Sequence, residues 1–336
     1  MKNYILRKII NSSSKDLKHN FFDKRNNPIK DKKYIEQCLE GLYLPPAYDD
    51  VKINLNKKAK VLAIGYDNKN RPQYIYNKKF TEKMKKQKYY NLYLFGLQYN
   101  KIITDINKNI KLPEDNKLKH VCMILRLIMD CDFRVGNDEY MKQNNSYGVS
   151  TLKTKHIIVK KGEVVIDFIG KKSVRNVCEV KNKTIKNHLK RKKKTLKNNT
   201  RIFTYKNDNS KKVNIKSIDV NNYIKQFGDF SSKDFRTWSA NIKLIQYLLN
   251  SNLDNLDKEI KECLEKVSDK LHHTPEVCKK NYIFTELIEF YKKDKTKFKN
   301  YLFTELIDFY KDEPVKFKKY FLKNINKKFT LFLKNN

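Results

Sequence analysis

The sequence predicts an α+β protein, in which a small, β-rich N-terminal domain (residues 1–80) precedes a larger, mainly helical domain (residues 81–336). The hydrophobic pattern supports this division. Before residue 80, aromatic and β-branched runs are short and separated by polar turns, whereas afterwards apolar residues recur at three- and four-residue spacing. With 336 residues and 39% hydrophobic content, the chain is long enough for two domains with a sizeable core.

The clearest N-terminal element is a hairpin predicted over residues 57–80, where the polar turn NKN separates the runs KVLAIGYD and PQYIYN. Two long helices are then predicted in TEKMKKQKYYNLYLFGLQYNKIITDI and NKLKHVCMILRLIMD. In the second of these, Val121, Ile124, Leu125 and Ile128 share one face. The larger domain therefore begins with helices.

A short β-meander is expected inside the helical domain, formed by KHIIVKK, EVVIDFIG and RNVCEVK. Its first turn lies at residues 161–163, and residues 171–173 lie near the second. The like-charged run HLKRKKKTLKNN (188–199) is compatible with a phosphate-contacting helix, but its charge density favours a flexible connector with backbone contacts.

A repeat with a period of 19 residues follows Tyr282, because NYIFTELIEFYKKDKTKFK precedes NYLFTELIDFYKDEPVKFK and a weaker third copy. Tyr282, Tyr301 and Tyr320 occupy equivalent places in it. A tyrosine in this context would ordinarily pack a helix, and only Tyr282 has a His-Thr-Pro sequence nine residues upstream.

The composition indicates a polyanionic partner. There are 74 Lys and Arg against 37 Asp and Glu, which gives a net charge of +37, and nucleic acid fits that charge best. An AT-rich genome would explain part of the lysine excess, but the positive field is present in either case. Arginine is rare by comparison, so it is expected mainly where a planar, permanently charged group is needed.

The six cysteines are scattered without a CxxC pair, which suggests a reducing compartment, buried thiols and no structural zinc. No P-loop, HExxH or EF-hand pattern is present, and Asp130-x-Asp132 is a poor candidate for a metal site. We therefore expect no cofactor, no nucleotide and no metal. No signal peptide or membrane-spanning segment is evident, so a cytoplasmic protein is expected.

Five residues form a set suited to attack on a phosphodiester, although each alone has an ordinary structural explanation. A tyrosine can be the nucleophile, arginines can hold the non-bridging oxygens, histidine can donate a further hydrogen bond to the phosphate, and lysine can protonate the departing 5′ oxygen. Their order and local contexts favour the joint interpretation. The set comprises Arg134 in DFRVGNDEY, Lys171 in DFIGKKSV, Arg236 in KDFRTWSA, and His273 and Tyr282 in HTPEVCKKNY.

With these residues in their order, the chain resembles the small type IB DNA topoisomerases of poxviruses, giant viruses and bacteria. LPPAYDDV (44–51) and GYDNKNRPQYIYNKKF (65–80) resemble the N-terminal module of that family. RVGNDEYMKQNNSYGVSTLKTKHI, FIGKKSV, IDVNNYI, KDFRTWSA and HTPEVCKKNYI resemble its catalytic core, so the resemblance covers about residues 40 to 285. The first ~35 residues and the repeats have no clear counterpart in the family.

The resemblance implies a catalytic domain like that of tyrosine recombinases and type IB topoisomerases. It implies nicking of one strand through a 3′-phosphotyrosyl link at Tyr282, rotation and resealing, which relaxes supercoils of both signs without metal or nucleotide. Gln73, Tyr74 and Tyr76 match the family's DNA-contacting segment. We expect a monomer on double-stranded DNA, in a viral factory or virion if the source is a virus, which the composition favours, and otherwise in the bacterial cytoplasm.

Two alternatives remain open at this stage. A tyrosine recombinase or integrase uses much the same residues, but Lys233 in KDFR stands where recombinases usually place histidine. A non-enzymatic, basic DNA-binding protein would need the charge but not the five-residue set.

Overall fold

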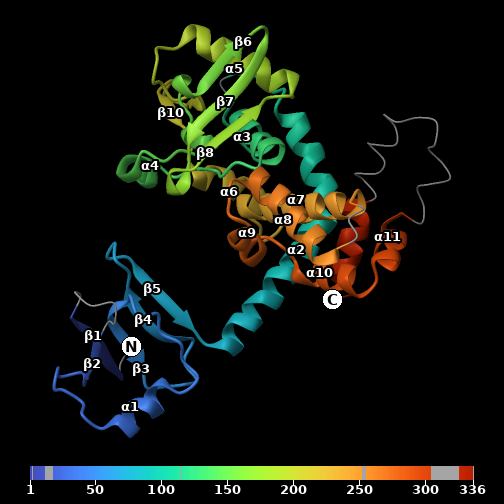
Figure 1. The fold of residues 1–336 in the computed structure, drawn as a ribbon. Coiled ribbons are helices and arrows are strands. Elements are labelled where there is room, and N and C mark those ends of the chain that lie inside the picture. The colour runs from blue at the N-terminus through green and yellow to red at the C-terminus, as the bar shows by residue number, and fades with distance from the viewer. Residues whose placement is uncertain (2, 12–17, 115, 252–254, 304–324, 336) are drawn as a thin grey trace. The chain divides into compact units, whose positions relative to one another are not determined.

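A computed structural model describes the chain except for residues 2, 12–17, 115, 252–254, 304–324 and 336. The chain forms two compact units, Met1–Lys88 and Tyr89–Asn336. Helix α2 (Lys78–Asn109) begins in the first unit and continues in the second (Figure 1). An N-terminal β-sheet and a larger, mostly helical part confirm the predicted fold class. The domain limits of 1–80 and 81–336 stay a prediction.

The first unit is built on an antiparallel five-stranded sheet with the order β2-β1-β3-β4-β5. The predicted hairpin is observed as β4 and β5, and the unpredicted strands β1 and β2 extend the sheet from the first 22 residues. Helix α1 (Lys32–Leu39) follows the N-cap Asp31. The strands are β1 (Tyr4–Asn11), β2 (Lys18–Phe22), β3 (Asp49–Asn54), β4 (Val61–Tyr66) and β5 (Pro72–Tyr76).

One small apolar core holds the first unit together. It contains Ile5 from β1, Val51 and Ile53 from β3, and Ala63 from β4. The alternation of side chains along a strand places these residues on the same face of the sheet. Beside the core, the buried Arg7 donates hydrogen bonds to the carbonyl oxygens of Pro45 (2.7 Å) and Tyr48 (2.9 Å), which fixes the LPPAYDDV loop.

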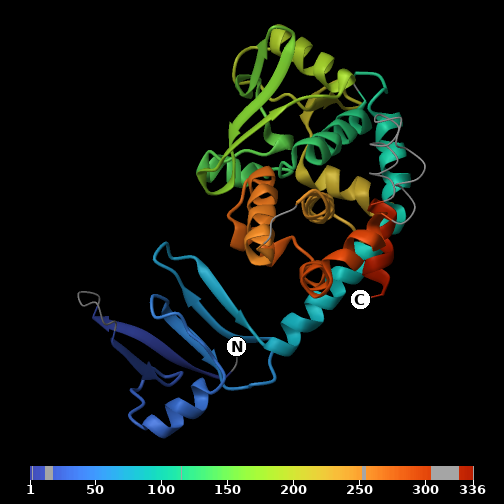
Figure 2. The same ribbon diagram turned by 45° about the vertical axis from the view of Figure 1, so that its right-hand side comes forward.

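The second unit combines a small sheet with a group of helices. The predicted meander is observed as an antiparallel sheet of β6 (Ile157–Lys160), β7 (Glu163–Ile169) and β8 (Arg175–Glu179). Figure 2 shows this sheet beside α5, with the helices α6 to α10 grouped below it. The remaining strands, β9 (Thr204–Lys206) and β10 (Lys212–Asn214), form a short, unpredicted hairpin.

The helices of this unit share one large apolar core. Most residues of helix α3 between His120 and Cys131 are buried, and the helix packs against α6 and α7. The helices are α3 (Lys117–Cys131), α4 (Asp138–Asn144), α5 (Lys183–Thr195), α6 (Ser217–Lys225), α7 (Ser232–Leu249), α8 (Leu256–Leu271), α9 (Pro275–Asn281), α10 (Thr285–Lys293) and α11 (Lys295–Phe303), with 3-10 turns at η1 (Val149–Thr151), η2 (Thr154–His156) and η3 (Lys171–Ser173).

The preference for a flexible connector at residues 188–199 was wrong, because most of this run lies in α5. Three apolar or aromatic residues, Ile185, His188 and Leu189, are buried at helical spacing among the lysines. They anchor the helix, which contacts β6 and β7, while the ring of His188 stacks on Phe203. The N-cap Asn182 begins the helix by accepting a hydrogen bond from the amide of Ile185. The lysines occupy its remaining surface.

The expectation that all cysteines are free thiols was also wrong. Cys131 and Cys178 form a disulfide, whereas Cys38, Cys122, Cys263 and Cys278 are free and buried, as expected. The pairing joins the end of α3 to β8, two elements whose proximity requires the folded sheet. No feature of the cysteine spacing could indicate it.

The C-terminal repeats are described only in part, since residues 304–324 lie outside the described part of the chain. Residues 325–334 are helical and return to the core, where the indole nitrogen of Trp238 donates a hydrogen bond to Asn326 at 2.5 Å. In the second copy of the repeat, the ring of Tyr301 packs against Phe290. This is the helix-packing role that a tyrosine in this context would ordinarily have.

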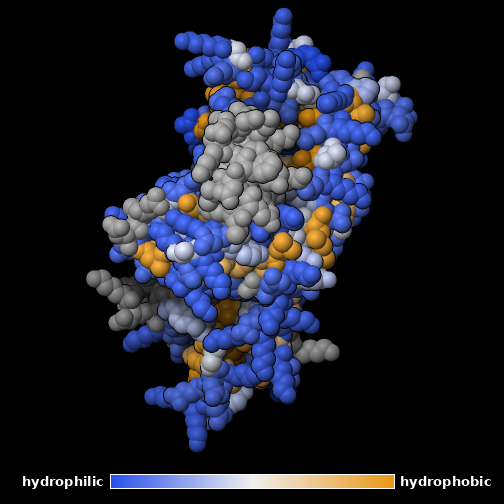
Figure 3. Space-filling view, turned by 90° about the vertical axis from the view of Figure 1, so that its right-hand side faces the viewer, coloured by the Kyte–Doolittle hydropathy of each residue, from blue (hydrophilic) through white to orange (hydrophobic). Residues whose placement is uncertain are grey.

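The surface agrees with the composition. On the face shown in Figure 3, hydrophilic side chains dominate among the described residues and apolar ones form only scattered groups. Among the described helices, none is long and apolar enough to span a bilayer.

Candidate active site

All five residues of the proposed catalytic set line one pocket of about 840 Å³ in the second unit. They come from the segment after α3, from the turn between β7 and β8, from α7 and from the α8–α9 region. Lys233 lines the same pocket. Motifs separated by up to 148 positions in the sequence are thus brought together around one space, and cations predominate among its charged groups.

The junction of α8 and α9 places His273 and Tyr282 beside each other. His272 ends α8 with a left-handed backbone (φ 55°), and the amide of His273 donates to the carbonyl of Ser268 at 3.0 Å. Thr274 caps α9 and Pro275 opens it, which suits a residue whose nitrogen has no proton to donate. Tyr282 ends this short helix and is only 7% exposed. The segment from His273 to Tyr282 therefore contains one short helix, α9.

His273 lies between Arg134 and Tyr282. Its Nε2 is 2.7 Å from Nη2 of Arg134 and 3.2 Å from the hydroxyl of Tyr282. Because a guanidinium can only donate, Nε2 accepts and the ring proton belongs on Nδ1. Burial is the largest cause that lowers the pKa of His273, and the nearby charges of Arg134 and Arg236 add to it, so that the pKa falls to about 3. The imidazole is therefore neutral at physiological pH.

Arg134 is held by its own backbone. Its carbonyl accepts from the amide of Val149 at 2.9 Å, and that of Val135 accepts from Ser150 at 2.7 Å. Two glycines make this approach possible. A Cβ on Gly148 would lie 2.5 Å from the Cα of Gly136, whose φ of 94° also favours glycine. Burial lowers the pKa of Arg134, as does Arg236 nearby, but an arginine remains charged at neutral pH.

Arg236 is a buried cation (3% exposed) in the first turns of α7. Nη2 donates to the carbonyl of Leu271 at 2.9 Å, and the guanidinium carbon lies 5.4 Å from the ring centre of Tyr282. Within the described part of the chain, Nε and Nη1 have no hydrogen-bond partner. A buried guanidinium with two unused donors is costly unless an anion binds to it.

Lys171 differs from the other four because it is exposed. It opens the η3 turn, in which Lys172 and Ser173 have positive φ values of 61° and 58°. Its ammonium lies 5.5 Å from the ring centre of Tyr140, which is itself 47% exposed. The turn presents Lys171 at the edge of the pocket, where the side chain has room to turn inward.

Sequence reasoning missed Asn241, which is fully buried on α7. Its amide nitrogen donates to the carbonyl of Tyr282 at 2.8 Å and to that of Thr237 at 2.7 Å, and its oxygen accepts from the amide of Phe284 at 2.7 Å. Asn241 thereby holds the backbone on both sides of Ile283. A polar residue within the apolar face of α7 was the available signal, because buried amides need partners.

The proposed DNA-contacting residues of the first unit lie on β5. Tyr74 and Tyr76 stack with ring centres 6.2 Å apart and are 50% and 41% exposed. Gln73 donates to the carboxylate of Asp67 at 3.0 Å, which also receives two hydrogen bonds from the Arg71 side chain. The hydrogen bonds from the Arg71 side chain lower the pKa of Asp67 to about 2. Together these residues form an exposed aromatic and polar strand edge.

Three or more histidine, cysteine or acidic side chains do not come together as a metal-binding group anywhere among the described residues. The pocket instead gathers two guanidiniums, lysines and a neutral imidazole around a tyrosine hydroxyl. Such a set can bind an anionic, oxygen-rich group and can place an oxygen nucleophile against it.

Comparison with known proteins agrees with this chemistry. Residues 77–306 match the family described as eukaryotic DNA topoisomerase I, catalytic core, and residues 18–67 match the N-terminal domain of bacterial DNA topoisomerase IB. DNA topoisomerase 1B of Acanthamoeba polyphaga mimivirus is 30% identical over 291 residues, covering 83% of this chain and 85% of the relative. DNA topoisomerase 1B of vaccinia virus (strain Copenhagen) is 28% identical over 278 residues, covering 79% and 85%. The chain therefore belongs to the type IB DNA topoisomerases.

Proposed function

We propose that this topoisomerase breaks one strand of duplex DNA by transesterification to Tyr282, allows the free end to rotate and then reseals the strand. One observation carries the proposal: His273 lies within hydrogen-bonding distance of both Arg134 and the Tyr282 hydroxyl, in the pocket where Arg236 has two unused donors. Positive and negative supercoils would both relax, because rotation of a free end follows whichever torsion the duplex carries.

The two arginines are proposed to hold the scissile phosphate. Arg236 offers Nε and Nη1, two donors on different edges of the guanidinium, either of which can donate to a phosphate oxygen. Arg134 would exchange its contact with His273 for a phosphate oxygen. Both cations would stabilise the negative charge that increases as the phenol oxygen attacks. This charge stabilisation comes from side chains, so the step as proposed requires neither a metal ion nor ATP.

His273 is proposed to act by hydrogen bonding. An imidazole whose pKa is about 3 is a weak base for a phenol, so it is poorly suited to remove the proton of Tyr282. When Arg134 turns to the phosphate, Nε2 is released and the ring can adopt the other tautomer. It can then donate to a phosphate oxygen, as the sequence predicts.

Lys171 is proposed to protonate the leaving group. The hydroxyl of Tyr282 gives its proton to solvent water as its bond from Oη to phosphorus forms, the bond from phosphorus to O5′ breaks, and the ammonium gives one proton to O5′. The product is a 3′-phosphotyrosyl link and a free 5′ hydroxyl. Resealing is the reverse, with O5′ as nucleophile and the neutral lysine as base. The exposed position of Lys171 leaves its side chain free to move from Tyr140 to the leaving oxygen.

Duplex DNA is the proposed partner of the whole chain, bound mainly through phosphates. A net charge of +37 supplies this attraction and predicts a steep dependence on salt. Gln73, Tyr74 and Tyr76 are proposed to contact DNA from β5, and Lys233 to contact a phosphate near the pocket. We propose a monomer that acts in the cytoplasm, in a viral factory or in a virion, as its viral relatives suggest.

The test is relaxation of positively and negatively supercoiled plasmid in EDTA without ATP. Wild type should relax both, Tyr282→Phe neither, and Tyr301→Phe should match wild type because Tyr301 holds the equivalent repeat position and packs a helix. Relaxation by Tyr282→Phe would exclude the assigned nucleophile. If wild type binds DNA tightly but relaxes no plasmid, a recombinase that needs its own sites or a purely architectural protein would fit better.

A further inference from the structure

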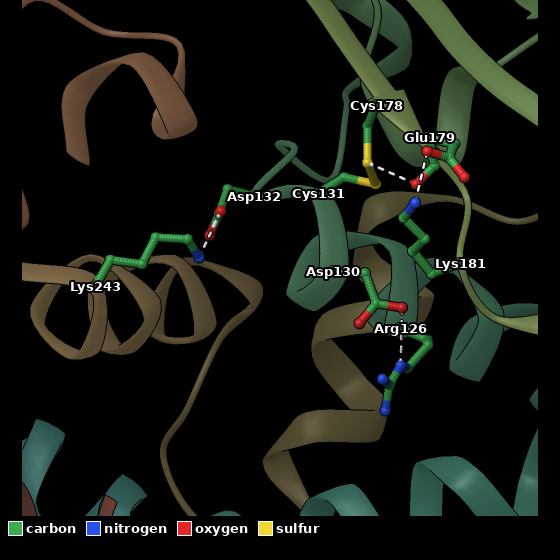
Figure 4. Close-up of a disulfide and its surroundings, with 8 residues drawn as sticks. All are labelled: Arg126, Asp130, Cys131, Asp132, Cys178, Glu179, Lys181 and Lys243. Atoms are coloured by element: carbon green, nitrogen blue, oxygen red, sulfur yellow. Dashed lines mark hydrogen bonds and ion pairs between the residues drawn. A yellow bond between two sulfur atoms is a disulfide. The ribbon is translucent and has the colours of Figure 1, made fainter. Parts of the chain in front are cut away.

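The segment that carries Arg134 is anchored on both sides immediately after α3. On one side Cys131, the last residue of α3, forms a disulfide with Cys178 on β8, and their Cα atoms are 5.7 Å apart (Figure 4). On the other side Asp132 pairs with Lys243 on α7, with Nζ 2.8 Å from the carboxylate. Figure 4 shows these two links leading in opposite directions from adjacent residues.

The disulfide encloses two of the proposed catalytic residues in one covalent ring. Arg134 follows Cys131 by three residues, and Lys171 precedes Cys178 by seven, within a closed segment whose ends are 47 positions apart. Cys178 on β8 pairs with Ile166 on β7 across the sheet. The disulfide is therefore joined to the pair of strands that carries the Lys171 turn. It thus links the position of that turn to the end of α3.

The ion pair connects the same segment to the helix of Arg236. Lys243 lies seven residues, or about two helical turns, after Arg236 on α7. Asp132 is 2% exposed and adopts a left-handed backbone (φ 53°), a conformation that aspartate tolerates. Through residues 131 and 132, the segment that carries Arg134 is therefore linked to both the Lys171 turn and the Arg236 helix.

Other contacts also hold the end of α3 and the segment of Arg134 against their neighbours. Phe133 packs edge-on against Phe168 of β7, with ring centres 4.9 Å apart, and the backbone of Arg134 bonds to that of Val149. These contacts should keep α3 and the sheet together after the sulfur bond breaks. Without the disulfide, however, the β7–β8 turn could still move slightly relative to Arg134. A displacement of about 1 Å can slow a reaction up to about a hundredfold.

We propose that the Cys131–Cys178 disulfide positions Arg134 and Lys171 relative to each other, so that the rate of strand cleavage depends on the redox state of this cysteine pair. Both cysteines are positioning residues, and the inference rests on the proposed function of the pocket. Cys178 is the more exposed of the two, so a dithiol would attack there. The S–S bond breaks, a mixed disulfide forms and resolves, each cysteine gains a proton, and the dithiol becomes a cyclic disulfide. Oxidised glutathione would reverse the change.

The experiment uses the full chain and measures single-turnover cleavage of a nicked duplex together with its affinity for that duplex. Peptide mass spectrometry after alkylation establishes the thiol state of each sample. The oxidised protein should cleave about tenfold faster than the dithiothreitol-treated protein. Affinity should change less than about twofold, because phosphate contacts spread over the surface dominate binding. Oxidised glutathione should restore the faster rate.

Two variants separate positioning from general thiol effects. Cys178→Ser should cleave at the rate of the reduced protein and should not respond to dithiothreitol. Cys38→Ser, which removes a buried thiol in the other unit, should keep the full response. If Cys178→Ser unfolds, the comparison of oxidised and reduced wild type still decides the matter.

Equal cleavage rates in the two chemically verified states would overturn the inference and leave the proposed function intact. Failure of the disulfide to form, even with oxidised glutathione, would also overturn it. Absence of cleavage by the wild type in both states would instead refute the proposed function, and the inference with it.

Discussion

Replacement of Asn241 by alanine should weaken the fold and slow cleavage together. The variant removes the partner of the Tyr282 carbonyl and the partner of the Phe284 amide, both of which are buried. An unsatisfied buried group costs about 1–3 kcal/mol, so the loss of two partners should lower the free energy of unfolding of the second unit by about 2–6 kcal/mol. The Thr237 carbonyl adds little to this loss because it lies within the helix.

The effect on cleavage follows from the same bonds. Without Asn241, the backbone that carries Tyr282 is no longer fixed to the helix of Arg236, and the phenol loses its alignment with the phosphate. We expect single-turnover cleavage to slow by about ten- to a hundredfold, with little change in DNA affinity. Urea unfolding and cleavage of a nicked duplex measure the two effects.

Asn250→Ala is the matched control, because Asn250 ends the same helix and its exposed side chain bonds only locally, to the carbonyl of Gln246. It should lose less than about 1 kcal/mol and keep its cleavage rate. If Asn241→Ala behaved like Asn250→Ala in both assays, the assignment of Asn241 as the residue that positions Tyr282 would be incorrect.

Three further predictions concern charge, acid and the DNA-contacting strand. Arg236→Lys should bind DNA nearly normally but cleave far more slowly, since the charge remains while the paired donors are lost; a rate within about threefold of wild type, or an equal loss in Arg126→Lys, would contradict this. Acid should destabilise the second unit below about pH 6.5, because burial lowers the pKa of His156 to about 4 and its Nδ1 accepts a backbone hydrogen bond. The unfolded chain then binds the extra proton, so this histidine alone should remove about 1–2 kcal/mol between pH 7 and pH 5, and His156→Asn should flatten that part of the urea-unfolding profile. Finally, Tyr74→Ala and Tyr76→Ala should each weaken duplex binding about five- to tenfold without altering stability, whereas Tyr43→Ala, an exposed tyrosine of the same unit, should not; equal affinities for all three would remove β5 from the DNA interface.

The convergence of the five residues could be predicted because each lies in a short motif with its own chemical reason. Arg134, Arg236 and His273 stand out against a lysine-rich background, and Tyr282 is distinguished from Tyr301 by the His-Thr-Pro sequence alone. The structure adds distances and protonation, which spacing cannot supply. That His273 is neutral follows from its burial among cations, a property of the folded pocket.

Other features could not be predicted because they depend on contacts between distant segments. The Cys131–Cys178 pair requires the end of α3 to meet β8, and Asn241 has a purpose only when Tyr282 lies beside α7. The misassignment of α5 has a different cause. Its many lysines concealed the three residues that are buried on one face of the helix, and a few such residues at helical spacing outweigh a long run of exposed charge.

The two buried guanidiniums of the pocket carry an energetic cost that their proposed task explains. Arg236 is buried with two unused donors, and Arg134 is directed at a neutral imidazole although its charge would favour an anion. A fold selected only for stability would avoid both arrangements, because apolar residues of similar size pack at no such cost. A phosphate placed between the two guanidiniums would give both cations an anionic partner and release His273 for its own hydrogen bond. The same groups that cost stability in the folded protein would therefore bind most strongly when negative charge increases at the phosphate during attack by Tyr282.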